Sequence, residues 1–163
     1  MKTNSSNGGE DWYEREQLHF AAGDGDLPKV ERLIKEGYPI NSFDDSLSRT
    51  PLHYAAVGEH LDVVRFLIKA GADINLREEK KIGNTVLAEI AQTCSLELAT
   101  ILVNAGADPT IPGWMGLTAL DGSARRKKPE GRQVHKLLCE AAKRSNPHWP
   151  RLAIFLKGTQ YSY

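Results

Sequence analysis

The sequence predicts an all-α solenoid, in which helix–turn–helix units of similar length stack on one another. Two observations carry this prediction. Three glycines that follow apolar stretches are spaced 34 and 35 residues apart, at Gly37, Gly71 and Gly106. Four leucines that open other apolar stretches follow each other at steps of 34, 35 and 33 residues, at Leu18, Leu52, Leu87 and Leu120. A period of this size is typical of repeat proteins, in which each unit is one supersecondary structure.

Within each unit the apolar residues have the spacing of a helix. Between Leu61 and Ile68 they recur at intervals of three and four, which gives one helix a broad apolar face. Gly71 follows as the helix stop, because a residue without a Cβ adopts positive φ at little cost. One helix pair cannot bury its own apolar face, so at least three stacked pairs are needed for a stable domain.

One stretch matches a known repeat almost position by position. The residues "TPLHYAA" from Thr50 to Ala56, followed by "HLDVVRFLIKAGADIN" up to Asn75, closely resemble the ankyrin repeat. The resemblance covers about four-fifths of the chain. It implies paired antiparallel helices, with a β-hairpin-like loop that projects between successive units.

The resemblance also implies the organisation of the chain. We expect a repeat domain at 12–146, with units at about 14–41, 42–75, 76–110 and 111–146. The first and last units are degenerate, as capping units that expose one face to water are expected to be. Residues 1–11 are expected to be disordered, and residues 147–163 to form a C-terminal extension that packs on the last unit.

Composition narrows the class of function. The chain has 40% hydrophobic and 26% charged residues and a formal net charge of zero, which argues against wholesale nucleic-acid binding. It has no apolar run near the roughly 18 residues of a membrane span, and no signal-peptide core. Cys94 and Cys139 lack a metal-type spacing. We therefore expect a cytoplasmic, disulfide-free protein with no membrane contact, no metal and no cofactor.

Net neutrality hides an uneven distribution of charge. Residues 1–49 contain ten Asp or Glu against six Lys or Arg, whereas residues 121–163 contain three against ten. In an extended chain the two ends would then have opposite potentials, which can steer a partner.

Departures from the repeat pattern predict where a partner binds. The loops at 41–50 and 75–85 are longer than the family pattern, although lengthening a surface loop is also cheap and tolerated. Trp114 and Met115 occupy the last loop tip, and an exposed Trp is typical of binding hot spots. The alternative is that the C-terminal extension covers them. Apolar residues recur at the earlier tips, at Phe43, Leu47 and Ile82.

Two further features bear on the binding surface. Glu89 stands where earlier units have an aromatic residue, so either its helix is rotated or its carboxylate faces the groove, because burial without a partner would be costly. Gln92, Thr93 and Val57 are expected to be exposed on the concave side. The basic run "ARRKKPEGR" from Ala124 to Arg132 has three interpretations: a solvated surface, a contact for an acidic protein, or a nuclear address or nucleic-acid patch.

Catalysis is not expected. By resemblance His53 has a structural hydrogen-bonding role, and His19 is its counterpart one unit earlier. His60, His135 and His148 have neither acid nor cysteine neighbours at ligand spacing. The sequence contains no nucleophile elbow, phosphate-cradling loop or recognisable pair of carboxylates.

The leading hypothesis is a non-catalytic protein–protein interaction module that binds and inhibits one folded partner through loop tips and the concave face. Its sharpest form is an immunity protein that neutralises a toxin, and the free protein is expected to be a monomer. The alternative is an adaptor that bridges two proteins without inhibiting either. The predicted contact residues are Phe43, Asp44, Asp45, Leu47, Arg49, Val57, Ile82, Asn84, Glu89, Gln92, Thr93, Trp114, Met115, Leu117, Arg125 and Arg126.

Overall fold

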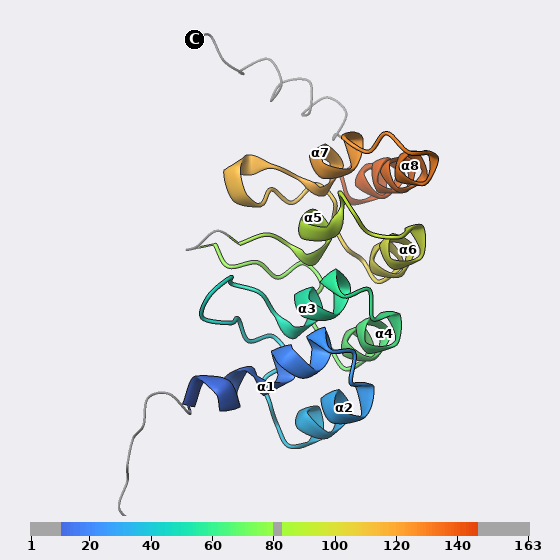
Figure 1. Ribbon diagram of the computed structural model, residues 1–163. Coiled ribbons are helices and arrows are strands. Elements are labelled where there is room, and N and C mark those ends of the chain that lie inside the picture. Colours follow the sequence, from blue (N-terminus) through green and yellow to red (C-terminus); the bar gives the residue numbers. More distant parts are fainter. Residues whose placement is uncertain (1–10, 80–82, 147–163) are drawn as a thin grey trace, which may run out of the picture. The chain divides into compact units, whose positions relative to one another are not determined.

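The computed structural model describes residues 11–79 and 83–146, and every regular element in these ranges is a helix (Figure 1). The expected C-terminal extension, residues 1–10 and Ile82 lie outside the described residues. The chain divides into two compact units, Met1–Asp73 and Ile74–Tyr163.

The first unit contains two helix pairs. Helix α1 (Asp11–Gly23) packs against α2 (Leu27–Lys35) and against α3 (Pro51–Val57), and α4 (Leu61–Lys69) packs against α2 and α3. Their shared core is made of fully buried leucines, valines and alanines, which include Leu18, Leu33, Leu52 and Leu67. Each helix therefore covers the apolar face of its neighbours, as the repeat pattern predicts.

The second unit repeats the arrangement. It contains α5 (Val86–Ile90), α6 (Leu96–Asn104), the 3₁₀ turn η1 (Trp114–Gly116), α7 (Ala119–Ala124) and α8 (Pro129–Ser145). Helix α7 packs against α5 and α8, and α8 packs against α6, around Leu87, Leu98, Leu102 and Leu138. In Figure 1 the loops before α5 and α7 project from the side of this unit opposite to α6 and α8.

The periodic glycines end helices as predicted. Gly37, Gly71 and Gly106 have φ values of 92°, 99° and 95°. At each of them the next residue donates its N–H to a carbonyl five residues back, for example Ala72 to Leu67 at 2.9 Å. This is the Schellman arrangement, in which a residue at positive φ turns the chain out of the helix.

A second repeated contact follows these turns. In the first unit the Asn41 Oδ1 accepts the N–H of Asp73 at 2.9 Å, and in the second the Asn75 Oδ1 accepts the N–H of Asp108 at 2.8 Å. The Asn75 Nδ2 also donates to the Gly106 carbonyl at 3.0 Å. These asparagines tie consecutive turns together within each unit.

The predicted role of His53 is confirmed. Its Nδ1 accepts the N–H of Thr50 at 3.1 Å and lies 2.8 Å from the Thr50 hydroxyl, so the side chain caps α3 from inside the core. His19, its counterpart, contacts the Ser42 carbonyl instead, with Nε2 at 2.9 Å.

The expected β-hairpin-like loops contain no strand in the described ranges. In the first unit one backbone hydrogen bond closes the loop tip, from Asp44 N–H to the Arg49 carbonyl at 2.9 Å. In the second unit Gly113 N–H donates to the Leu117 carbonyl at 2.8 Å. The loops are thus closed turns, held by backbone and side-chain hydrogen bonds.

Candidate protein-binding surface

The last loop presents three exposed apolar side chains together. Trp114 is 52% exposed, Met115 71% and Leu117 40%. The alternative, in which the C-terminal extension covers the first two, concerns residues outside the described ranges. The Trp114 N–H donates to the Asn84 Oδ1 at 3.0 Å. Met115 itself adopts a φ of 57°. The loop thus has a defined shape, held from the preceding loop of the same unit.

A hollow of about 150 Å³ lies beside this loop, between α5, α7 and the two loops that precede them. We call it the Trp114 hollow. Its lining includes six of the predicted contact residues, namely Asn84, Glu89, Gln92, Trp114, Leu117 and Arg125. An apolar wall and several polar groups therefore face one space, which is the usual composition of a site that orients a ligand group.

The structure also bears on the two alternatives for Glu89. The residue is half-buried and lines the Trp114 hollow, which favours the alternative in which its carboxylate faces the open side of α5. Gln92 and Thr93, in the turn that follows α5, are exposed as expected. Position 89 can therefore hold a carboxylate where other units hold an aromatic ring.

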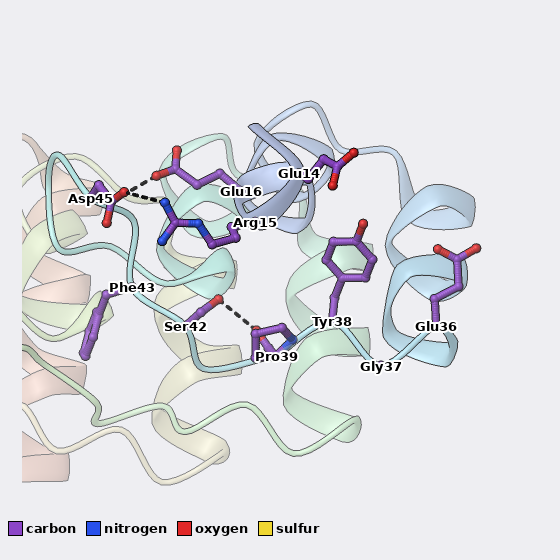
Figure 2. Close-up of a pocket in the computed structure, with 10 residues that line it drawn as sticks. All are labelled: Glu14, Arg15, Glu16, Glu36, Gly37, Tyr38, Pro39, Ser42, Phe43 and Asp45. Atoms are coloured by element: carbon purple, nitrogen blue, oxygen red, sulfur yellow. Dashed lines mark hydrogen bonds and ion pairs between the residues drawn. The ribbon is translucent and has the colours of Figure 1, made fainter. Parts of the chain in front are cut away.

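Most predicted contact residues of the first unit also reach solvent. Asp45, Leu47 and Val57 are exposed. Arg49 is half-buried, with its guanidinium carbon 5.9 Å from the centre of the Tyr54 ring. Phe43 is half-buried and lines a pocket of the first unit, which Figure 2 shows.

The prediction for Asp44 has to be corrected. The residue was expected to face a partner, but it is only 1% exposed. Its carboxylate accepts hydrogen bonds from the N–H groups of Leu47 and Arg49, at 2.9 and 3.0 Å, and from the Tyr54 hydroxyl at 2.6 Å. Burial raises the pKa of the Asp44 carboxyl, but these hydrogen bonds more than offset that effect, and the pKa lies below its ordinary value. Asp44 holds its loop together.

The prediction for Arg126 also has to be corrected. It was among the predicted contact residues, in a run interpreted as a solvated surface, a contact for an acidic protein, or a nuclear address or nucleic-acid patch. Its Nη1 instead donates to the carbonyl of Cys94 at 2.8 Å and approaches that of Ala91 at 3.4 Å. The guanidinium thus binds carbonyls of the turn that follows α5. Arg125, Lys127 and Lys128 are exposed, so the basic run divides into one structural arginine and several surface cations.

His135 does have a cysteine neighbour, contrary to expectation. Its Nε2 lies 3.5 Å from the Cys139 Sγ, one helical turn along α8, and its Nδ1 lies 2.9 Å from the buried Ser123 Oγ. Burial raises the pKa of the Cys139 thiol, which disfavours the nucleophilic thiolate. Among the described residues no cluster of three or more His, Cys, Asp or Glu could hold a metal ion.

A comparison with protein families now decides the class of the chain. A family described as ankyrin repeats in three copies matches residues 18–113, which is more than half of the chain. The chain belongs to the ankyrin-repeat family. Its all-helical units agree with the predicted all-α repeat fold. Ankyrin repeats are generally protein–protein interaction modules and are typically non-catalytic.

A search of curated proteins returned no match to this ankyrin-repeat chain. No helix in the described part of the chain is both long and apolar enough to cross a membrane. The family match ends at position 113, one residue before Trp114, so the exposed loop tip and the α7–α8 pair lie beyond the matched segment.

Proposed function

We propose that this ankyrin-repeat protein binds one folded protein partner through the Trp114 loop and the Trp114 hollow, and inhibits that partner by occlusion. The observation that carries the proposal is the pair Trp114 and Met115, exposed side by side on a loop whose shape Asn84 holds. Large exposed apolar side chains cost solvation free energy in the free protein, and covering them with a partner recovers it.

The geometry supports tight rather than incidental binding. Trp is the residue most enriched among binding hot spots, and such residues act best beside a pocket that excludes water. Because the loop is already hydrogen-bonded in the free protein, it loses little conformational entropy when it binds a partner. A protruding tip with a hollow beside it can enter a concave surface and receive one side chain in return.

Inhibition follows from that shape when the partner is an enzyme. A Trp–Met tip fits a concave surface, and the active site of an enzyme is usually the most concave surface that it has. The sharpest form of the proposal is an immunity protein that neutralises a toxin in the cytoplasm. The two cysteines are free thiols, as is usual in that reducing compartment.

A second candidate function is an adaptor that joins two proteins without inhibiting either. It is favoured by the exposed cations Arg125, Lys127 and Lys128 at the turn between α7 and α8, which could recruit a separate acidic partner. The two candidates differ in the number of partners bound at once and in whether an activity is lost.

The test compares the wild type with the double variant Trp114→Ala, Met115→Ala. Its matched control is Leu96→Ala, which removes an exposed apolar side chain, 37% exposed, from α6 in the same unit. The partner is captured from a lysate of the native cells and purified. Its affinity and stoichiometry are then measured by titration calorimetry, and its activity is measured with and without one equivalent of each variant.

We expect the wild type and Leu96→Ala to bind one to one and abolish activity. The double variant should bind at least about 100-fold more weakly at unchanged thermal stability, since two hot-spot side chains are lost. Equal affinity of all three proteins would place the interface elsewhere. Binding of one partner with its activity intact, together with a second protein in the complex, would replace the inhibitor by the adaptor.

A further inference from the structure

A pocket of about 480 Å³ opens in the first unit, between the first turns of α1, the end of α2 and the loop that follows (Figure 2). We call it the acidic groove. It belongs to a different unit from the Trp114 hollow and shares no residue with it. Its volume is large enough for a long side chain together with the backbone on either side of it.

The lining of the acidic groove has an unbalanced charge. Four carboxylates line it, from Glu14, Glu16, Glu36 and Asp45, against the single guanidinium of Arg15, which leaves a formal charge of −3. Outside the pocket, Arg32 approaches Glu36 at 3.7 Å on the exposed surface of α2 and reduces this excess only in part. The excess favours a cationic ligand.

At one end of the groove the charged side chains already bind one another and the loop backbone. The Arg15 guanidinium lies 3.4 Å from the Asp45 carboxylate, and the Glu16 carboxylate accepts the Asp45 N–H at 3.0 Å. These contacts join α1 to the loop, as the dashed lines in Figure 2 show. The carboxylates of Glu16 and Asp45 at this end therefore already have partners.

At the other end of the groove, polar groups remain available to hydrogen-bond a ligand. In Figure 2 the Tyr38 ring stands between Glu14 on α1 and Glu36 beyond the end of α2. Within the described residues, neither the Glu14 carboxylate nor the Tyr38 hydroxyl makes a hydrogen bond or ion pair. The Pro39 ring continues the floor beside Tyr38. An aromatic face thus lies between two carboxylates, next to an apolar floor.

We propose that the acidic groove binds an arginine side chain presented by an extended segment of a protein partner. A guanidinium stacks on an aromatic face and donates hydrogen bonds in its own plane, so Tyr38 and the two glutamates could be engaged together. The methylene stem of the arginine would lie along Tyr38 and Pro39. An acidic or purely apolar segment would leave the charge excess unmatched. This site goes beyond the proposed function, which does not require it.

The test uses the full chain, labelled with ¹⁵N, and a blocked hexapeptide with one arginine among glycines and serines. A second peptide has citrulline in place of arginine, which keeps the shape and removes the charge. The protein variant is Glu14→Gln, Glu36→Gln. Its control, Asp24→Asn, Glu31→Gln, removes the same charge from residues of the same unit outside the groove.

We expect the arginine peptide to shift the backbone resonances of Glu14, Tyr38 and Glu36, and the citrulline peptide to leave them unchanged. The groove variant should bind the arginine peptide about three- to tenfold more weakly, as the loss of two exposed ionic contacts implies, and the control variant should bind as the wild type does. Unchanged thermal midpoints would show that the variants are folded.

Three results would overturn the proposal. Equal weakening in both variants would indicate general attraction to an acidic unit, and equal binding of both peptides would exclude a role for the guanidinium. No shift in the groove at millimolar arginine peptide would exclude the site. The double variant Trp114→Ala, Met115→Ala should bind the arginine peptide normally, so failure here and failure of the proposed function are distinguishable.

Discussion

The Tyr54 hydroxyl on α3 donates a 2.6 Å hydrogen bond to the carboxylate of Asp44, which is buried at the base of the preceding loop. The same carboxylate accepts two backbone N–H groups from the loop. One side chain thus joins a projecting loop to the first helix of a repeat. Because the Asp44 carboxylate is buried, water cannot replace these hydrogen bonds without a cost in free energy.

Replacing Asp44 by Ala should lower the free energy of unfolding by about 2–3 kcal/mol, because three donors lose a buried, charged acceptor. Asp45→Ala, at the exposed neighbouring position, should cost no more than about 1 kcal/mol. Urea denaturation followed by far-UV circular dichroism measures both. Equal losses at the two positions would contradict a special role for Asp44.

The same pair predicts how stability depends on pH. The pKa of the Asp44 carboxyl lies below its ordinary value of 3.8, so its contribution is present above pH 3.8 and is lost as the pH falls further. Burial and the adjacent Asp44 raise the pKa of Tyr54 above its ordinary value of 10.0, so that contribution is present below pH 10.0 and is lost as the pH rises.

Asp44→Asn should therefore flatten the acid side of a plot of stability against pH, and Tyr54→Phe the alkaline side. Urea midpoints measured across both limits test this, with Asp45→Asn and Tyr38→Phe as matched controls. If the stability of a variant depends on pH as steeply as that of its control, the residue replaced in that variant does not govern the pH dependence.

Gly71 tests the repeated helix stop. It has a φ of 99°, and no heavy atom lies within 4 Å of where a Cβ would be, so any cost of a side chain comes from the backbone conformation alone. We expect Gly71→Ala to cost about 1–2 kcal/mol and Gly71→Asn less, because Asn tolerates the left-handed region better. Thermal and urea unfolding give the ranking. An Ala variant as stable as the wild type would show that the turn relaxes.

Local features of this molecule could be predicted from its sequence. Helix pairs and glycine stops depend on contacts a few residues apart, and the period of about 34 residues marks them repeatedly. The exposure of Trp114 follows from its place at a loop tip, where no neighbouring helix covers it.

Features that depend on distant residues could not be predicted in this way. Arg126 was assigned to the surface because its target carbonyl, at Cys94, lies 32 residues away. Asp44 was predicted to be an exposed acid of the loop, because its contact with Tyr54 forms only when the loop folds back onto α3. The His135–Cys139 contact is different: a spacing of four on one helix was visible in the sequence and could have been recognised.

Arg125 and Arg126 form a matched pair for the next prediction. Arg126→Ala should destabilise the protein by about 1–2 kcal/mol, because a half-buried charged donor to the Cys94 carbonyl is lost. Arg125→Ala, which is exposed, should change stability by less than about 0.5 kcal/mol. Both variants are compared by urea denaturation. A larger loss at Arg125 would reverse the two roles.

The last prediction concerns how Asn84 shapes the Trp114 loop. Its Oδ1 accepts the Trp114 N–H and fits directly against Gly113, where any Cβ would collide with it. Asn84→Ala should leave Trp114 exposed but remove this restraint. Hydrogen exchange at the Trp114 amide should then accelerate roughly threefold to tenfold, as expected for one net hydrogen bond.

The control is Gln92→Ala, which changes an exposed side chain that lines the same hollow and should leave the exchange rate unaltered. In the Asn84→Ala variant the loosened loop would have to become ordered on binding. This variant should therefore also weaken partner binding, although every apolar contact is kept. Unchanged exchange at Trp114 would mean that the loop is held by its own Gly113–Leu117 bond, and affinity should then not depend on Asn84.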